Sequence, residues 1–307
     1  MVSLLTRHRP QTFKDVIGQD AAVRALQRAL EADASHAYLL TGPSGTGKTT
    51  LARLAATALG AGGLDIREID AASDTGIDDM RAVTEGIMYR PMGGTATVII
   101  VDEAHGLTKQ AKGSLLKSLE EPPAWVYWFL CTTDPTRIPT NIRTRCISIE
   151  LQPVRQSVLT EWLDKIDKAD NLGVSQPITS LCVKTALGSP RQALANLGLC
   201  LAAKDREEAA SLLKTAEDES QAVELARALI KGSSWPVLVN VIMGLKDTPP
   251  ETVRRVVQAY VAKVLTSGKN PGQGLAILEA FEKPFYDEHT LAPLFLACGR
   301  LVFSEGE

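Results

Sequence analysis

The sequence lacks any long apolar run. No stretch approaches the roughly 18 apolar residues that a membrane-spanning helix needs. The first residues, "MVSLLTRHRPQTF", also lack the apolar core and the small-residue cleavage site of a secretory signal. We therefore expect a cytoplasmic protein that has no membrane partner.

Cysteine is scarce and scattered. The chain has five cysteines and no C-x-x-C pair. A zinc site or a disulfide framework would need closer or regularly spaced cysteines, so neither is expected. We expect small buried apolar residues at Cys131, Cys146, Cys182, Cys200 and Cys298.

An excess of positive charge is also missing. The formal net charge is -3 and the isoelectric point is about 5.9, whereas a nucleic-acid-binding domain is usually basic. Any contact with DNA must therefore be local, or be assembled from several subunits.

The first half of the chain alternates between strand and helix patterns. Apolar or β-branched segments at 36–42, 66–70, 95–105, 125–134 and 146–153 predict strands, and "KTTLARLAATALG" at 48–60 predicts a helix. Such alternation is typical of an α/β domain with a parallel sheet covered by helices. After Pro153 the pattern becomes helical, and a softer break occurs near residue 205. The predicted domains are 1–152, 153–205 and 206–307.

The segment "TGPSGTGKTT" at 41–50 matches the phosphate-binding spacing G-x-x-x-x-G-K-[ST] between a strand and a helix. Glycines let backbone N–H groups approach phosphate oxygens closely, and the helix N-terminus favours negative charge. Lys48 is expected to reach the β and γ phosphates, and the Thr49 hydroxyl to bind Mg²⁺. The predicted nucleotide loop comprises Gly42, Pro43, Ser44, Gly45, Thr46, Gly47, Lys48, Thr49 and Thr50.

A second motif, "VIIVDEAH" at 98–105, places two carboxylates after a buried strand. Asp102 is predicted to hold the metal, and Glu103 to orient the attacking water as a general base. The two motifs together predict ATP hydrolysis with Mg²⁺ as the metal and without zinc.

These motifs resemble those of AAA+ ATPases, and further stretches resemble the motor subunits of sliding-clamp loaders, of the bacterial gamma/tau type and the small subunits of replication factor C. The resemblance implies an AAA+ P-loop domain, a small helical lid and an all-α C-terminal collar. The matching stretches are "RHRPQTFKDVIGQD", "IDAASDTGIDDMR", "VDEAHGLTKQAKGSLLKSLEEPP", "CTTDPTRIPTNIRTRC" and "GSPRQALANL".

The resemblance also implies roles for polar residues outside the two motifs. Thr133 is similar to the sensor-1 residue near the γ-phosphate, and Arg191 to the sensor-2 arginine that reaches the nucleotide from the lid. Arg145, in "TRC", resembles the arginine that acts in trans on the nucleotide of a neighbouring subunit, with Thr144 where serine is usual. A guanidinium at that place would neutralise charge on the transferring phosphoryl group.

The N-terminal stretch resembles the segment that lies over the adenine, with Val16 and Ile17 as its apolar contacts. His8 stands where an aromatic residue is common, and we expect an exposed side chain there. The four-cysteine zinc module of bacterial gamma/tau proteins is absent between the two motifs, as is a long C-terminal extension. The chain is thus nearer to the compact small-subunit design, which a bacteriophage or another streamlined replisome could use.

Two surfaces are predicted for the partners. Thr75, Gly76 and Ile77 at a helix start, with Arg81, would follow DNA phosphates in a shape-specific manner, although Arg81 could equally pair with Asp78 on its own helix. Three apolar residues at the end of that helix are predicted either to bind the clamp or to fill the core; they are Met88, Tyr89 and Met92.

The predicted function is that of an ATP-driven motor subunit that opens a sliding clamp and places it on primer–template DNA. Its partners would be the clamp, the DNA, further copies of itself and at least one different loader subunit, in an assembly of five. Two alternatives remain: another DNA-associated AAA+ ATPase of the branch-migration type, or a scaffold that binds ATP in order to assemble.

Overall fold

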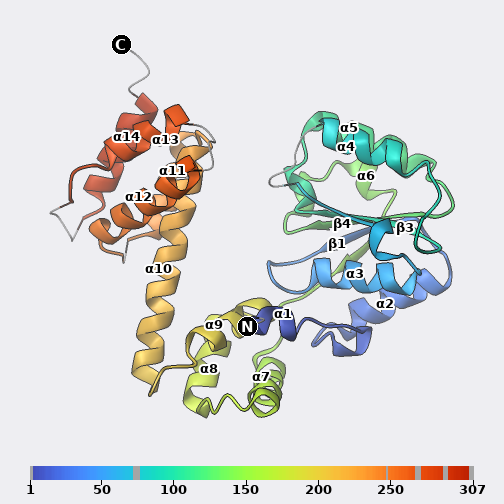
Figure 1. Cartoon of the computed structure of the whole chain (residues 1–307), viewed down its shortest axis with the longest axis horizontal. Coiled ribbons are helices and arrows are strands. Elements are labelled where there is room, and N and C mark those ends of the chain that lie inside the picture. Colours follow the sequence, from blue (N-terminus) through green and yellow to red (C-terminus); the bar gives the residue numbers. More distant parts are fainter. Residues whose placement is uncertain (1–2, 72–76, 247, 267–270, 286–289, 304–307) are drawn as a thin grey trace. The chain divides into compact units, whose positions relative to one another are not determined.

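The chain separates into two compact units, Met1–Arg206 and Glu207–Glu307. The structure, a computed structural model, describes residues 3–71, 77–246, 248–266, 271–285 and 290–303 (Figure 1). In these ranges no helix is both long enough and apolar enough to cross a membrane. The division at residues 152 and 205 remains a prediction.

A five-stranded parallel sheet forms the centre of the first unit, in the order β2-β3-β4-β1-β5. Buried apolar and β-branched side chains favour the three central strands, β3, β4 and β1, on both faces, whereas the edge strands β2 and β5 are only partly buried. The predicted strands and the parallel arrangement are confirmed. The strands are β1 (Ala37–Thr41), β2 (Ile66–Asp70), β3 (Thr97–Asp102), β4 (Val126–Thr132) and β5 (Ile147–Glu150).

Helices cover both faces of this sheet (Figure 1). Successive strand side chains point to opposite faces, so Trp128 packs with helices α4, α5 and α6, while Phe129 packs with α2 and α3. These helices are α2 (Asp20–Glu31), α3 (Lys48–Ala58), α4 (Ile77–Gly86), α5 (Lys109–Glu120) and α6 (Thr140–Arg143), and four 3-10 turns lie at Phe13–Asp15, Gly63–Asp65, Ala104–Gly106 and Pro135–Arg137.

The remainder of the first unit is helical. The Ser189 hydroxyl accepts a hydrogen bond of 3.2 Å from the backbone N–H of Gln192, which caps α9. A short N-terminal helix, α1, packs against α9. The bounds are α1 (Leu4–Arg7), α7 (Gln156–Asp170), α8 (Gln176–Thr185) and α9 (Pro190–Leu199).

Helices α10 to α14 make up the second unit around a separate apolar core. A buried ion pair joins Glu251 and Arg254 in α12 at 2.7 Å. The helical prediction after Pro153 is thereby confirmed. The bounds are α10 (Arg206–Ile230), which begins at the division between the units, α11 (Trp235–Gly244), α12 (Pro250–Thr266), α13 (Pro271–Ala280) and α14 (Ala292–Phe303).

Candidate nucleotide-binding site

The predicted phosphate loop connects the end of β1 to the start of α3. Gly42 has φ 138° and Gly45 has φ 72°, values that L-residues with a side chain rarely adopt. A Cβ atom would lie 2.2 Å from the Leu151 carbonyl oxygen at Gly42, and 2.2 Å from the Ser189 Oγ at Gly45. The loop therefore needs glycine at both positions, for its backbone shape and for its close packing.

Lys48 is held inside this loop and is only 6% exposed. Its Nζ donates hydrogen bonds to the carbonyl oxygens of Gly42 (2.8 Å) and Pro43 (3.0 Å). Burial lowers the pKa of Lys48, while the nearby Glu103 carboxylate acts in the opposite direction. The loop thus fixes a cation at the place where the motif requires one.

Thr49 and Asp102 meet although they are far apart in the sequence. The Thr49 Oγ1 donates a hydrogen bond of 2.7 Å to Asp102 Oδ2, because α3 begins beside the C-terminal end of β3. Hydroxyl and carboxylate oxygens are the ligands that Mg²⁺ prefers. This pair therefore fits the predicted metal role of both residues.

Glu103 follows β3 directly and has φ 45°, an uncommon value for a residue other than glycine. Its Oε2 accepts a hydrogen bond of 3.2 Å from Thr133 Oγ1 and lies 3.3 Å from His105 Nδ1. The structure thus brings together the predicted base and the predicted sensor-1 threonine. The contact with His105 was not predicted, although this residue is part of the "DEAH" stretch.

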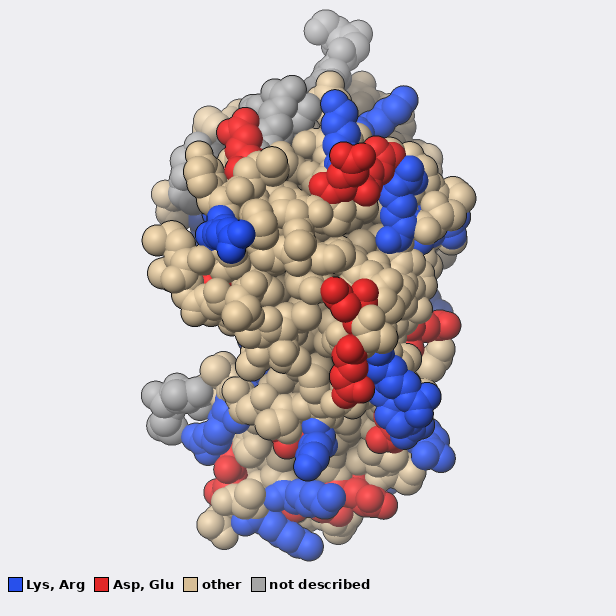
Figure 2. Space-filling view, turned by 90° about the vertical axis from the view of Figure 1, so that its right-hand side faces the viewer, with Lys and Arg blue, Asp and Glu red and all other residues tan. Residues whose placement is uncertain are grey.

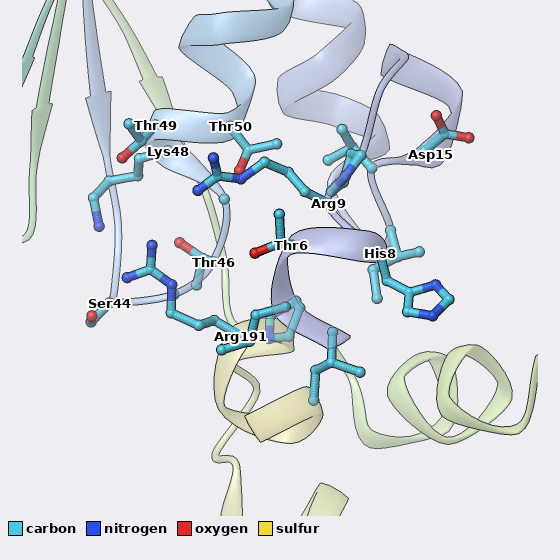
Figure 3. Close-up of a pocket in the computed structure, with 18 of the residues that line it drawn as sticks. Thr6, His8, Arg9, Asp15, Ser44, Thr46, Lys48, Thr49, Thr50 and Arg191 are labelled. Atoms are coloured by element: carbon cyan, nitrogen blue, oxygen red, sulfur yellow. The ribbon is translucent and has the colours of Figure 1, made fainter. Parts of the chain in front are cut away.

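A cavity of about 550 Å³ lies over the loop. Figure 3 shows Arg9 and Arg191 extending into it on the side of the phosphate loop. Their positive charges, with that of Lys48, suit a polyphosphate. The predicted residues that line the cavity are Val16, Ile17, Ser44, Gly45, Thr46, Gly47, Lys48, Thr49, Thr50, Asp102, Glu103 and Arg191.

Several lining residues were not predicted. Thr6, Arg9 and Pro10 come from the N-terminal segment, and Trp162 and Leu194 come from α7 and α9. The charge of Arg9 within "RHRP" was the available signal, whereas nothing in the helical pattern marked Trp162 or Leu194. The cavity is therefore built by the sheet domain, the N-terminal segment and the predicted lid together.

Arg145 is not among the residues that line this cavity. It lies between α6 and β5, where its Nη2 contacts Glu120 Oε1 at 2.7 Å and its Nη1 donates to the Asn141 carbonyl oxygen at 2.7 Å. Its side chain is 36% exposed. An exposed guanidinium away from the cavity of its own chain is the placement that a residue acting on a neighbouring subunit would need.

The expectation that His8 is exposed was wrong. Its side chain is 18% exposed, and its Nε2 lies 2.8 Å from Asp170 Oδ2 at the end of α7. Arg7 Nη1 lies 2.9 Å from the same oxygen. The hydrogen bond with His8, and the charges of His8 and Arg7, lower the pKa of Asp170.

The predicted DNA surface is described only in part. Thr75 and Gly76 lie outside the described residues, while Ile77 and Arg81 belong to α4. Basic and acidic side chains are interspersed on the face that Figure 2 shows, without an extended patch of one sign. The contact with DNA remains a prediction.

The three apolar residues after α4 are exposed. Met88, Tyr89 and Met92 have exposed fractions of 68%, 77% and 87%, so the alternative that they fill the core was wrong. The Trp125 indole N–H donates to the carbonyl oxygens of Ile87 (3.2 Å) and Tyr89 (3.1 Å). The loop is thus held in place while its apolar side chains face solvent.

None of the five cysteines, all of which the structure describes, forms a disulfide; Cys131, Cys182, Cys200 and Cys298 are buried as expected, whereas Cys146 is half-buried. Within the described part of the chain, no group of three or more His, Cys, Asp or Glu side chains could hold a metal ion.

Family models match two overlapping parts of the chain. The model described as DNA polymerase III, delta subunit matches residues 63–155, and that of magnesium chelatase, subunit ChlI matches residues 12–92. Among solved structures, the Thermotoga maritima RuvB Holliday junction branch migration motor has a TM-score of 0.55 at 21% identity, covering 73% of this chain and 79% of that chain. This likeness shows a common fold.

The chain is also similar in sequence to curated proteins. It is 32% identical over 255 residues to the Haemophilus influenzae DNA polymerase III subunit tau/gamma, covering 75% of this chain and 37% of that protein. It is 36% identical over 211 residues to the Bacillus subtilis DNA polymerase III subunit tau, covering 62% of this chain and 38% of that protein. The chain is thus similar in sequence to DNA polymerase III tau/gamma subunits, and it spans about two fifths of the length of these two relatives.

Proposed function

We propose that this chain is an ATP-driven motor subunit of a clamp loader, which opens a sliding clamp and places it on primer–template DNA. One observation carries the proposal. Thr49, Asp102 and Glu103 line one cavity, with Thr133 hydrogen-bonded to Glu103, whereas Arg145 lies elsewhere on the same unit. Such a division of the catalytic groups makes hydrolysis depend on assembly.

Each residue near the cavity has a distinct role in this proposal. Bound Mg²⁺·ATP supplies the phosphoryl group and the metal that neutralises part of its charge. Lys48 holds the phosphates, and Thr49 and Asp102 supply metal ligands. Glu103 orients the attacking water and polarises it. The hydrogen bond between Glu103 and Thr133 couples the position of this base to the threonine that would lie near the γ-phosphate. Arg191 contacts the phosphates from α9.

Arg145 completes the site of a neighbouring copy. Its guanidinium would neutralise charge that develops on the transferring phosphoryl group, an effect of about 10³-fold or more where it has been measured. ATP bound between copies then favours a spiral arrangement of the subunits that holds an open clamp. Hydrolysis destabilises this arrangement, and the closed clamp is released. The names of the relatives, which are subunits of DNA polymerase III, support this replicative role.

The partner surfaces follow from the same arrangement. The start of α4, with Ile77 and Arg81, would face DNA phosphates, and the exposed Met88, Tyr89 and Met92 would contact the clamp. A ring with further copies and at least one different subunit, five in all, would give an acidic chain enough DNA contacts. Substituting serine at Met88 and Met92 should weaken clamp binding and spare ATP binding, measured by pull-down and by nucleotide titration.

The test of hydrolysis uses Glu103→Gln. This variant should bind ATP and stay bound to the clamp, because it loses the group that polarises the water while the nucleotide contacts remain. Glu121→Gln, at an exposed glutamate outside the cavity, is the control and should release the clamp normally. If Glu103→Gln releases the clamp like the unaltered chain, the scaffold alternative gains and the motor proposal fails.

A further inference from the structure

Asp170 connects two segments that are distant in the sequence. Its Oδ2 contacts both His8 Nε2 (2.8 Å) and Arg7 Nη1 (2.9 Å), and its side chain is only 11% exposed. Arg7 is 48% exposed, so the less exposed contact with His8 is the stronger constraint. One carboxylate at the end of α7 thus ties down the N-terminal segment.

This tie lies beside the cavity. Thr6, His8, Arg9 and Pro10 line it from the N-terminal segment, and Trp162 lines it from α7, the helix that ends with Asp170. Figure 3 shows the Arg9 side chain extending toward the phosphate loop and the His8 ring extending in the opposite direction. His8 and Arg9 are adjacent in the chain, so the contact of His8 with Asp170 anchors the backbone from which Arg9 extends.

The attachment of the N-terminal segment otherwise depends on short elements. Helix α1 has 4 residues and no buried side chain, and a helix so short has little stability of its own. Leu4 approaches α9 at Gly198, where its Cδ1 lies 3.6 Å from the position of a Cβ atom. The carboxylate of Asp170 is therefore a main constraint on a wall of the cavity.

We propose that Asp170 is a positioning residue for nucleotide binding, which holds the N-terminal wall of the cavity in place through His8 before ATP arrives. The inference rests on the proposed nucleotide site but not on clamp loading. Without the contact between Asp170 and His8, only a fraction of the molecules has the N-terminal wall in the place that ATP binding needs. The apparent affinity for ATP is then reduced in proportion to that fraction. Loss of the contact between Asp170 and His8 should therefore lower the apparent affinity for ATP by about fivefold.

The test measures the dissociation constant of Mg²⁺·ATP for the full chain by isothermal titration calorimetry. Asp170→Ala and His8→Ala should each weaken binding about fivefold, and the double variant should bind no more weakly than Asp170→Ala alone. Asp170→Ala already removes the contact with His8, together with the more exposed contact with Arg7. His8→Gln, which keeps an N–H donor at a similar distance from the backbone, should bind nearly as tightly as the unaltered chain. Asp164→Ala is the matched control, since Asp164 is in the same helix but accepts its hydrogen bond from Gln176.

A second measurement separates positioning from a general loss of folding. Amide hydrogen exchange without nucleotide should accelerate over residues 3–12 in Asp170→Ala and not in Asp164→Ala, while the β1 and β4 amides stay protected in both. If Asp170→Ala and His8→Ala bind ATP as the unaltered chain does, while Lys48→Ala does not bind, the inference is overturned and the nucleotide site stands. If Lys48→Ala also binds normally, the proposed site itself is wrong.

Discussion

Replacing Gly45 by alanine should disrupt the contact between the phosphate loop and α9. Gly45 has φ 72°, and a Cβ atom there would lie 2.2 Å from Ser189 Oγ and 3.1 Å from Arg191 Cβ. Either the Ser189 hydroxyl must rotate away, which breaks its cap of α9, or the loop or the start of α9 must move. Because Arg191 is at that start, the change should also weaken nucleotide binding.

The free-energy cost has two parts. A residue with a side chain in the left-handed region costs about 1 kcal/mol, and forcing an extra carbon into a packed contact costs about 2 kcal/mol. We therefore expect Gly45→Ala to lower the free energy of unfolding of the first unit by about 3 kcal/mol. Ser189→Ala alone should cost about 1 kcal/mol, because it removes the hydroxyl that caps α9.

The double variant separates these two parts. Removing the Ser189 hydroxyl relieves the closest contact, so the double variant should lose about 1 to 2 kcal/mol less than the sum of the single variants. Urea unfolding followed by hydrogen exchange of the β1 and β4 amides reports on this unit. Gly113→Ala is the control, because among the described residues no atom beyond its chain neighbours and its own helix backbone lies within 4 Å of the added carbon, and alanine should stabilise its helix. Strictly additive losses, or no loss for Gly45→Ala, would refute the reasoning.

Three further predictions concern pH, reactivity and the exposed apolar loop. Hydrogen bonds from Arg254 lower the pKa of Glu251 from 4.5 to about 2. The ionised Glu251 should therefore stabilise the second unit above pH 4.5, and this stabilisation should be lost as the pH falls toward 2. Glu251→Gln should abolish this pH dependence of stability, measured by acid unfolding followed by circular dichroism. Burial raises the pKa of the Cys131 thiol well above 9.0, so iodoacetamide at pH 8 should leave Cys131 unmodified until the chain unfolds, as mass spectrometry of its peptide would reveal. The carboxylate of Asp65 accepts hydrogen bonds of 2.7 Å each from the backbone N–H groups of Met92 and Gly93. Asp65→Ala should therefore accelerate hydrogen exchange at these two amides and lower the free energy of unfolding by about 2 kcal/mol. Unchanged exchange at both amides would contradict this role of Asp65.

The sequence predicted the strands and the phosphate loop because their signals are local. Buried parallel strands are continuous apolar runs, and the spacing from Gly42 to Thr49 is fixed by the geometry of one turn. Thr49 and Asp102 were both predicted to bind the metal, which implies that they lie close together, but their hydrogen bond was not predicted. Only the structure could give its distance.

The residues whose placement the sequence did not predict depend on contacts with distant parts of the chain. Whether His8 is exposed depends on where α7 ends, 162 residues later in the chain, and no local pattern contains that information. Trp162 and Leu194 read as ordinary apolar positions of amphipathic helices until the lid helices are placed beside the loop. For Met88 and Met92 the composition favoured core and surface equally, because it does not show which side of a loop faces solvent.

The central claim is that hydrolysis is completed by Arg145 of a neighbouring copy. The most direct measurement is steady-state ATP hydrolysis by the purified chain, alone and with primed DNA and the sliding clamp of the same source, compared with Arg145→Ala. DNA and clamp should strongly stimulate ATP hydrolysis by the unaltered chain, and Arg145→Ala should abolish this stimulation while ATP binding persists. Adding Lys48→Ala chains, which keep Arg145, to Arg145→Ala chains should restore part of the activity. Stimulated hydrolysis that survives Arg145→Ala would contradict the central claim.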